Sequence, residues 1–514
     1  MLRLHVLAAT AVFAVCSVRP VFAQDLVVDT TGAGVLIDEA LNRSEVMQNL
    51  QYLSDVVGPR LTGSSAARRA NDWTLERFKA YGLEAHLEPW KFGGTWTRGP
   101  MRALMTAPRA HDVIAASWAW APGTGGATVT GPVVRIDATT PDSFVLYRGR
   151  VKQAWVMTRP PSLVWNTDGP SMTAADSQRQ RDFFRTIFTP FRDLDSTTRA
   201  RMQQFANDLP YLLRRAGALG ILQDASKEHA LLNMSGSPNR ILPLPQIAVA
   251  HEDYALFDRL LQAGTPPQLA VSISNTITRD SVTQWNTVAE IRGSEHPGQM
   301  VIVGAHLDSW DLGTGTTDNG TGAMCTVEAA RIIARSGLRP KRTIRFVLFT
   351  GEEQGLIGSR KYAEAHAAEA DSIQAVIVLD NGTGAITGQA LQGRTDLESL
   401  WRAVLAPVAR LGVDSVVNRN KTGTDHLSFL PYGVPGFNFN QLERGYGHTH
   451  HSQSDTYDMA VAADLMQASA VMAVSAYELA NLSGMIPRGN QTEPTPVQAV
   501  KVSDSLIVKG KGSY

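Results

Sequence analysis

Histidine and carboxylate side chains gather at a few positions in the second half of the chain. Each of them follows a short apolar run or lies in a turn before a helical stretch: His306, Asp318, Glu352, Glu353, Asp380, His448, His450 and His451. Imidazole and carboxylate groups bind Zn²⁺ well without any thiolate ligand. Brought to one place, these side chains would form a zinc site.

The number of these side chains fits a pair of metal ions. Two metals about 3.5–4 Å apart are readily held when one carboxylate bridges them. The side chains available as four terminal ligands and one bridge are His306, Asp318, Glu353, Asp380 and one histidine of residues 448–451. Glu352 then remains beside a ligand, where it can take a proton from water as a general base. Asp308, two residues beyond His306, can fix the tautomer of that imidazole.

Each residue also has an ordinary explanation when it is taken alone. A histidine at a strand end usually forms hydrogen bonds within a loop, and an aspartate before a helix is usually its N-cap. Paired glutamates usually face solvent, and a histidine cluster can lie on a surface loop. The metal site is therefore a prediction from the whole set and depends on the elements that position it.

The elements around these residues predict an α/β fold. The runs at residues 300–305, 343–349 and 376–379 are apolar and β-branched with little alternation, as in strands that are covered on both faces. Another strand is expected at residues 436–440. Helical stretches at residues 322–336, 356–367, 397–411 and 462–482 separate or follow the strands, which indicates a mixed, largely parallel sheet covered by helices. The metal-binding residues would then meet at the carboxyl edge of the sheet.

Composition and expected secondary structure divide the chain into five parts. Residues 1–23 resemble a signal peptide, with Arg3, an apolar run and a small-residue cleavage site before Gln24. Residues 24–121, with helices expected over about 42–81, form the first part of the catalytic domain. Residues 122–275 carry short β-like runs and one polar helix near residues 177–205, and read as an inserted β-rich domain. Residues 276–486 hold the metal site, and residues 487–514 form a tail in which residues 502–508 could add an edge strand.

Composition excludes several classes of protein. The 514 residues hold 48 Lys+Arg against 48 Asp+Glu, with no block of like charge, so we expect no nucleic-acid partner. Nothing after the signal peptide is apolar enough for a membrane span, so we expect an exported protein, periplasmic or secreted, with no membrane partner. Only Cys325 remains after signal cleavage; it excludes an internal disulfide and is expected to pack in the core.

Several motifs together resemble the family-28 metallopeptidases, which are co-catalytic di-zinc exopeptidases. The resemblance is carried by residues 305–310, the turn at 317–320, the Gly-Glu-Glu-Gln-Gly element at 351–355 and the segment 450–456, and residues 58–61 support it. It extends from about residue 42 to residue 482. It implies the zinc exopeptidase fold, with an insert similar to the protease-associated domain of larger members. That insert is either a lid over the site or a packing module.

The resemblance also assigns roles to residues. It implies two Zn²⁺ per chain, and the residues involved are His306 and Asp380 for one zinc, Glu353 and His451 for the other, Asp318 as the bridge and Glu352 as the base. His450 stands where many relatives have a tyrosine, and its imidazole N–H can donate to the developing oxyanion. The family pattern further implies a cis peptide bond between Asp318 and Asn319, and Asn381 is neutral where some relatives have an acidic residue.

The expected activity is hydrolysis of a peptide bond next to a free N-terminus, as an aminopeptidase or dipeptidase. The expected partner is a peptide or dipeptide substrate, and the resemblance implies a homodimer. Two alternatives belong to other classes. One is an acyltransferase similar to glutaminyl cyclase, which uses this fold with a single zinc; the other is a receptor-like binding protein with an inactive site. The full set of expected ligands with Glu352 favours the peptidase.

Overall fold

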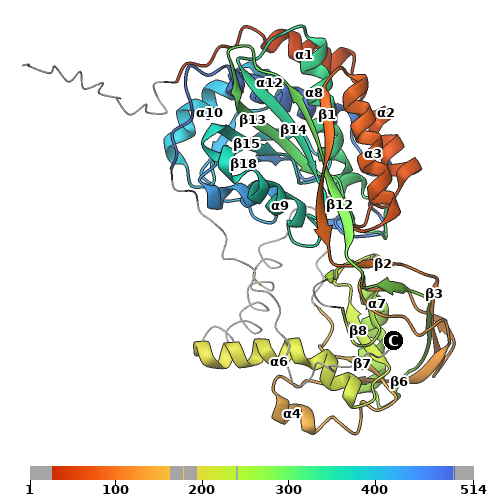
Figure 1. Ribbon diagram of the computed structural model, residues 1–514. Coiled ribbons are helices and arrows are strands. Elements are labelled where there is room, and N and C mark those ends of the chain that lie inside the picture. Colours follow the sequence, from red (N-terminus) through yellow and green to blue (C-terminus); the bar gives the residue numbers. More distant parts are fainter. Residues whose placement is uncertain (1–25, 163–177, 179–193, 239–240, 490, 492–514) are drawn as a thin grey trace, which may run out of the picture.

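The protein is described by a computed structural model over residues 26–162, 178, 194–238, 241–489 and 491. Two lobes are visible in Figure 1: a larger one built on a sheet between helices, and a smaller one built on a second sheet. The expected signal peptide at residues 1–23 and the expected strand at residues 502–508 lie outside the described residues.

The sheet of the larger lobe has eight strands and mixed direction. In spatial order they are β1 (Glu84–Phe92), β12 (Val282–Ile291), β14 (Arg342–Phe349), β13 (His296–His306), β15 (Ile373–Val378), β18 (Gly436–Gln441), β16 (Ile386–Ala390) and β17 (Ser415–Val417). The four central strands β14, β13, β15 and β18 are parallel. Strands β1 and β12 pair antiparallel to their neighbours, and β16 pairs antiparallel with β18 and parallel with β17. The predicted mixed, largely parallel sheet is confirmed.

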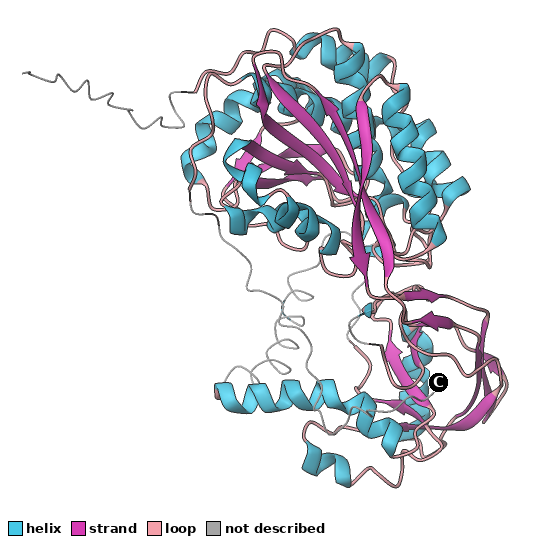
Figure 2. Cartoon of the chain, in the orientation of Figure 1, coloured by secondary structure: helices cyan, strands magenta, loops and turns pink. Residues whose placement is uncertain are grey.

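Alternating side chains of the central strands enter two separate cores. On β13, Val301, Val303 and Ala305 pack into the core beneath one layer of helices, whereas Met300 and Ile302 pack into the opposite core. Figure 2 shows helices on both faces of this sheet. Because both faces are buried, the segments at residues 300–305, 346–349 and 375–378 contain no polar side chains, which explains why they lack alternation.

The expected helices are present, and one of them ends earlier than expected. They are α8 (Thr321–Arg335), α9 (Ile357–Ala365), α10 (Glu398–Leu405) and α12 (Ala462–Asn481). The stretch expected to be helical over residues 397–411 changes to a 3₁₀ helix at Ala406–Leu411, where Pro407 lacks the N–H that an α-helix needs. The expected helices of residues 42–81 are α2 (Val46–Gln51), a π-helical turn and α3 (Ser65–Ala80). Ser64 caps α3 by accepting the N–H of Ala67.

The smaller lobe contains the predicted β-rich region and begins earlier than expected. Its strands, in spatial order, are β4 (His111–Asp112), β3 (Met101–Ala107), β10 (Gln268–Ile273), β6 (Val129–Arg135), β7 (Trp155–Met157), β8 (Gly220–Asp224), β9 (Gln246–Val249) and β5 (Ala115–Ser117). The expected start at residue 122 therefore lies inside this sheet. Strand β3 is rich in Ala, Leu and Met, which favour helices, and pairing with β10 overrides that preference.

The remaining features of this lobe follow the prediction in part. Of the helix expected near residues 177–205, residue 178 is helical and residues 196–205 belong to α6 (Ser196–Arg215); residues 163–177 and 179–193 lie outside the described part. The short strands β2 (Thr95–Thr97) and β11 (Thr276–Thr278) pair with each other where the chain passes between the lobes (Figure 1).

Two expectations from composition are tested by the structure. Cys325 lies on α8 with no exposed surface, and burial raises the pKa of its thiol to about 12, so it packs as a core residue. Within the described residues, none of the helices has the length and apolarity required of a membrane span.

Candidate metal centre

The parallel strands carry the expected residues to one edge of the larger sheet. His306 is the last residue of β13, Glu352 and Glu353 follow β14, and Asp380 follows β15. His451 lies in the loop beyond β18. These strands run in the same direction, so their carboxyl ends meet at one edge, where α/β folds place their binding sites.

The four other side chains expected as ligands gather around Asp318. One carboxylate oxygen of Asp318, Oδ1, lies 3.4 Å from His306 Nε2, and the other, Oδ2, lies 3.3 Å from His451 Nε2. His306 Nε2 is also 3.4 Å from an oxygen of Asp380, and His451 Nε2 is 3.1 Å from an oxygen of Glu353. Asp318 thus lies between two groups of potential ligands.

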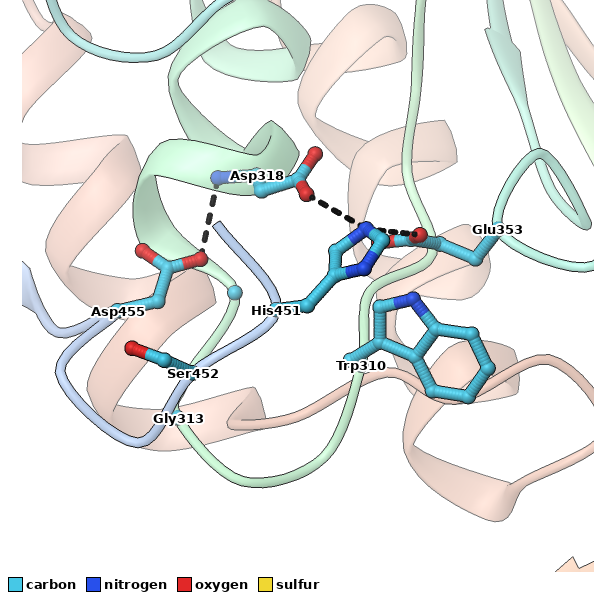
Figure 3. Close-up of a pocket in the computed structure, with 8 residues that line it drawn as sticks. Trp310, Gly313, Asp318, Glu353, His451, Ser452 and Asp455 are labelled. Atoms are coloured by element: carbon cyan, nitrogen blue, oxygen red, sulfur yellow. Dashed lines mark hydrogen bonds and ion pairs between the residues drawn. The ribbon is translucent and has the colours of Figure 1, made fainter. Parts of the chain in front are cut away.

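Figure 3 shows how the second of these groups is arranged. His451 points between Asp318 and Glu353, and the ring of Trp310 lies beside it with centroids 5.7 Å apart. The small pocket around them is lined by Trp310, Gly313, Gly315, Asp318, Glu353, His451, Ser452 and Asp455. His448 is directed elsewhere: its ring stacks on His229 with centroids 6.4 Å apart. The structure therefore brings His451, and not His448, to Asp318 and Glu353.

Hydrogen bonds from neighbouring residues fix the backbone turn that carries Asp318. The expected cis peptide bond between Asp318 and Asn319 is present. The Asp455 carboxylate accepts the N–H groups of Thr317 at 2.6 Å and Asp318 at 3.1 Å. The amide of Asn319 donates to Leu379 O at 2.9 Å and accepts from Gly322 N at 3.0 Å, which ties this turn to the end of β15.

Asp308 fixes the tautomer of His306 as expected, and it does so through its backbone. His306 Nδ1 lies 3.0 Å from the backbone oxygen of Asp308, whereas the Asp308 carboxylate is 3.7 Å away. A carbonyl accepts only from an N–H, so the backbone fixes Nε2 as the nitrogen that is free to bind a metal. The carboxylate instead accepts the N–H groups of Glu352 at 3.2 Å and Glu353 at 3.4 Å, and orients that turn.

Burial dominates the electrostatics of this cluster. It raises the pKa of Glu353 to about 7, with Asp318 adding to the effect and His451 opposing it. Burial likewise raises the pKa of Glu352 well above its usual range. Burial disfavours the charged form of His451, but Glu353 and Asp318 together raise its pKa to about 10. Carboxylates packed this closely repel one another, and bound cations would offset that repulsion.

His450 and Tyr446 lie at the rim of the cluster. The His450 ring stacks on His451 with centroids 3.7 Å apart, and its Nε2 is 3.8 Å from Asp318 Oδ2. Burial, reinforced by His451, lowers the pKa of His450 to about 4, so this imidazole is neutral and retains one N–H donor. Tyr446 was not expected at the site. Its ring packs on that of His450 at 5.1 Å, and burial beside Asp318 raises the pKa of its phenol.

Arg60, a buried residue to which the sequence assigned no role, holds the backbone that leads to the site. Arg60 has no exposed surface, and its guanidinium donates to the carbonyl oxygens of Leu307 at 2.6 Å, Thr314 at 2.8 Å and Gly315 at 2.7 Å. These bonds fix the segment between His306 and Asp318. The only sequence signal for Arg60 is its place in the family-like motif at residues 58–61.

One further carboxylate, that of Asp425, lies close to the cluster. Asp425 is fully buried at the start of a 3₁₀ helix (Asp425–Tyr432), whose N-cap is Thr424, so Asp425 is not the helix cap. Burial raises the pKa of Asp425 to about 7, with Asp380 also contributing. Asp425 is therefore an additional buried carboxylate close to Asp380.

The potential ligand atoms are grouped closely enough to bind a metal. Two groups of described residues have potential ligand atoms within 4.8 Å of one another: His306 with Asp318 and Asp380, and Asp318 with His450 and His451. Glu353 Oε1 is buried without a hydrogen-bond partner among the described residues. A buried carboxylate oxygen without a partner is costly unless a cation binds it, so the residues fit a metal centre.

Comparison with known proteins agrees with this geometry. Residues 286–476 match the sequence profile of peptidase family M28. Carboxypeptidase Q of Rattus norvegicus is 31% identical over 449 residues, covering 87% of each chain. The crystal structure of a peptidase M28 precursor from Shewanella amazonensis superposes with a TM-score of 0.70 at 24% identity, covering 90% of this chain and 98% of that one. A zinc aminopeptidase from Bacillus subtilis gives a TM-score of 0.59 at 18% identity, covering 84% and 94%.

The family resemblance seen in the motifs is confirmed by this identity, which extends over nearly the whole of both chains. The solved structures confirm the fold. From the extent of the match to carboxypeptidase Q and the match of residues 286–476, the chain belongs to peptidase family M28 and is a metallopeptidase.

Proposed function

We propose that this protein is a co-catalytic exopeptidase that holds two zinc ions and cleaves the peptide bond next to a free N-terminus. In this proposal one zinc is bound by His306 and Asp380, the other by Glu353 and His451, and Asp318 bridges them. The observation that carries it is the position of Asp318, whose two carboxylate oxygens face different histidines at 3.4 and 3.3 Å. A shared carboxylate between two ligand groups is the arrangement that a metal pair requires.

Zinc ions bound there would polarise the substrate carbonyl and lower the pKa of the attacking water. Glu352 has an oxygen 3.9 Å from His306 Nε2 and serves as the general base. It takes the proton of the attacking water and then delivers that proton to the leaving amine. His450 donates its N–H to the oxygen on which negative charge develops.

Recognition of the amino end is supported by charge. Glu352 and Asp425 are carboxylates beyond the proposed ligand set, and both influence one another through the buried site. An excess of carboxylates within the cluster favours an ammonium group over a carboxylate on the bound substrate. The test is a panel of dipeptides and longer peptides with free, N-acetylated or C-amidated ends. Cleavage lost on acetylation but kept on amidation supports the proposal, whereas the reverse pattern assigns carboxyl-end recognition.

Metal content separates this proposal from its main alternative. Dialysis against a chelator is expected to abolish hydrolysis, and added Zn²⁺ is expected to restore it. Elemental analysis of the active protein is expected to give two zinc ions per chain. One zinc per chain, with cyclisation of N-terminal glutamine, would instead support an acyltransferase similar to glutaminyl cyclase.

The proposal extends to location and assembly. We propose that the chain is exported after cleavage before Gln24 and acts as a homodimer on small peptides. N-terminal sequencing of the exported protein is expected to begin at Gln24, and sedimentation is expected to give twice the mass of the mature chain.

A further inference from the structure

A segment of the smaller lobe lies directly against the loop that carries His450 and His451. The lobe segment, residues 227–234, follows strand β8 of the smaller lobe, and the histidine loop, residues 447–453, follows β18 of the larger one. Their contacts are hydrogen bonds between residues more than 200 positions apart in sequence. The two lobes therefore meet at the candidate metal centre.

Lys227 makes the most concentrated of these contacts. Its ammonium Nζ donates to the backbone oxygens of Gly447 at 2.8 Å, His448 at 3.3 Å and His450 at 2.7 Å. An ammonium group has three N–H donors and no acceptor, so these three bonds use its full capacity. Lys227 is thus occupied by the histidine loop and has no donor left for the carboxylate of a substrate.

The bonds fall on both sides of His451. This residue has a φ of 58°, in the left-handed region that side chains other than glycine seldom adopt. The peptide oxygen before it, on His450, is held by Lys227, and the peptide oxygen after it is held by Met234 N at 2.8 Å. The uncommon backbone conformation of His451 is therefore fixed from the smaller lobe.

Other contacts between the same segments do not touch the backbone of His451. The side chain of Gln453 accepts from Leu232 N at 2.8 Å and donates to Ala230 O at 3.1 Å. These two bonds hold the lobe segment to the histidine loop independently of Lys227. They provide a matched control, because their loss would loosen the same interface without releasing the peptide groups around His451.

From this arrangement we infer that Lys227 is a positioning residue for His451, so that the smaller lobe completes one half of the metal centre. The inference rests on the proposed two-zinc function. It gives the smaller lobe a role beyond that of a lid or packing module. We expect the zinc affinity of the site formed by Glu353 and His451 to depend on Lys227. The site formed by His306 and Asp380 is built from residues at the carboxyl ends of strands of the larger sheet, so its zinc affinity should not depend on Lys227.

The test measures zinc binding in the full-length protein. Lys227→Met removes the three donors and keeps an unbranched side chain, and Lys152→Met changes an exposed lysine of the same lobe. Each variant is equilibrated against a series of free Zn²⁺ concentrations, and bound zinc, turnover and thermal unfolding are measured. Loss of residues that orient metal ligands typically weakens metal binding by about 10- to 100-fold. We expect that loss at one of the two sites of Lys227→Met, with turnover restored at saturating zinc.

The outcomes distinguish the inference from the proposed function. A wild-type protein that binds fewer than two zinc ions would refute the two-zinc function itself. If the wild type binds two, wild-type affinity at both sites of Lys227→Met would overturn the inference. An equal loss of zinc affinity in Gln453→Ala would also overturn the inference, because the loss would then reflect general loosening of the interface. Should Lys227→Met fail to fold, Lys227→Gln, whose shorter side chain cannot reach all three oxygens, carries the same expectation.

Discussion

Replacing Glu352 with glutamine isolates the proposed base from the proposed ligands. The amide has nearly the size of the carboxylate, and the backbone N–H of residue 352 can still donate to Asp308, as it does at 3.2 Å. The nearest ligand nitrogen, His306 Nε2, is 3.9 Å from the Glu352 carboxylate, farther than it is from Asp318 or Asp380 at 3.4 Å. The substitution should therefore remove a proton acceptor and leave the ligand set in place.

The size of the effect follows from the role of a general base. Such a group contributes about 10²- to 10⁴-fold to the rate. Each tenfold change corresponds to about 1.4 kcal/mol, so the barrier should rise by about 3–5 kcal/mol. The neighbouring carboxylates Glu353 and Asp380 are already committed as ligands in the proposed mechanism, so neither can replace the lost base. We expect the loss in kcat, with little change in KM.

The assay compares three proteins: wild type, Glu352→Gln and Glu364→Gln. Glu364 is an exposed residue of α9 paired with Lys361, so its substitution controls for the loss of one carboxylate. Dipeptide hydrolysis, zinc content and thermal unfolding are measured on each. Turnover of Glu352→Gln within a few-fold of wild type would refute the role of the base. Loss of zinc from Glu352→Gln would show that Glu352 is a ligand instead.

Three further predictions concern the histidines, the rim and the stability of the fold. His451→Ala should lower zinc content by one per chain and abolish turnover, whereas His448→Ala should keep both zinc ions; equal loss from the two would contradict the choice of His451. His450→Ala should lower kcat by about 10²- to 10³-fold with zinc retained, as for other oxyanion donors. If Tyr446→Phe shows that loss and His450→Ala does not, the donor is the phenol of Tyr446. Glu478 is buried, its carboxylate lacks a hydrogen-bond partner among the described residues, and burial raises its pKa to about 8. Because the unfolded chain releases that proton near its ordinary pKa of about 4.3, stability should fall as pH rises from about 4.5 to about 8. Glu478→Gln should remove this decline, so its gain in Tm over wild type should be larger at pH 8 than at pH 5; an equal Tm difference at both would refute it.

Much of the fold could be predicted because the buried strands carry a strong signal. Within the central strands, the segments at residues 300–305, 346–349 and 375–378 are buried and consist of apolar residues and glycine. The edge strand β1 was not predicted, because it has one exposed face and contains charged residues and a proline. Its position is set by pairing with β12 along nine residues, which only the folded chain provides. The same applies to β3, which moves the start of the smaller lobe before residue 122.

The candidate site could likewise be predicted in part from the sequence. Residue types and their placement after strands were enough to single out His306, Asp318, Glu353 and Asp380, because parallel strands deliver their carboxyl ends to one edge. The choice of His451 came from a motif. That its backbone adopts a left-handed conformation could not be read from the sequence.

What the sequence by itself determined is the set of candidates: which side chains are proposed to bind metal, which carboxylate is proposed as the base, and to which family the motifs point. Only the tertiary structure decided how these groups are held. Arg60 and Lys227 bind backbone oxygens of residues distant in sequence, at Leu307 and His450, and the backbone of Asp308 rather than its carboxylate orients His306. A carbonyl oxygen has the same chemistry at every position along the chain, so the pattern of residue types carries no signal for such bonds.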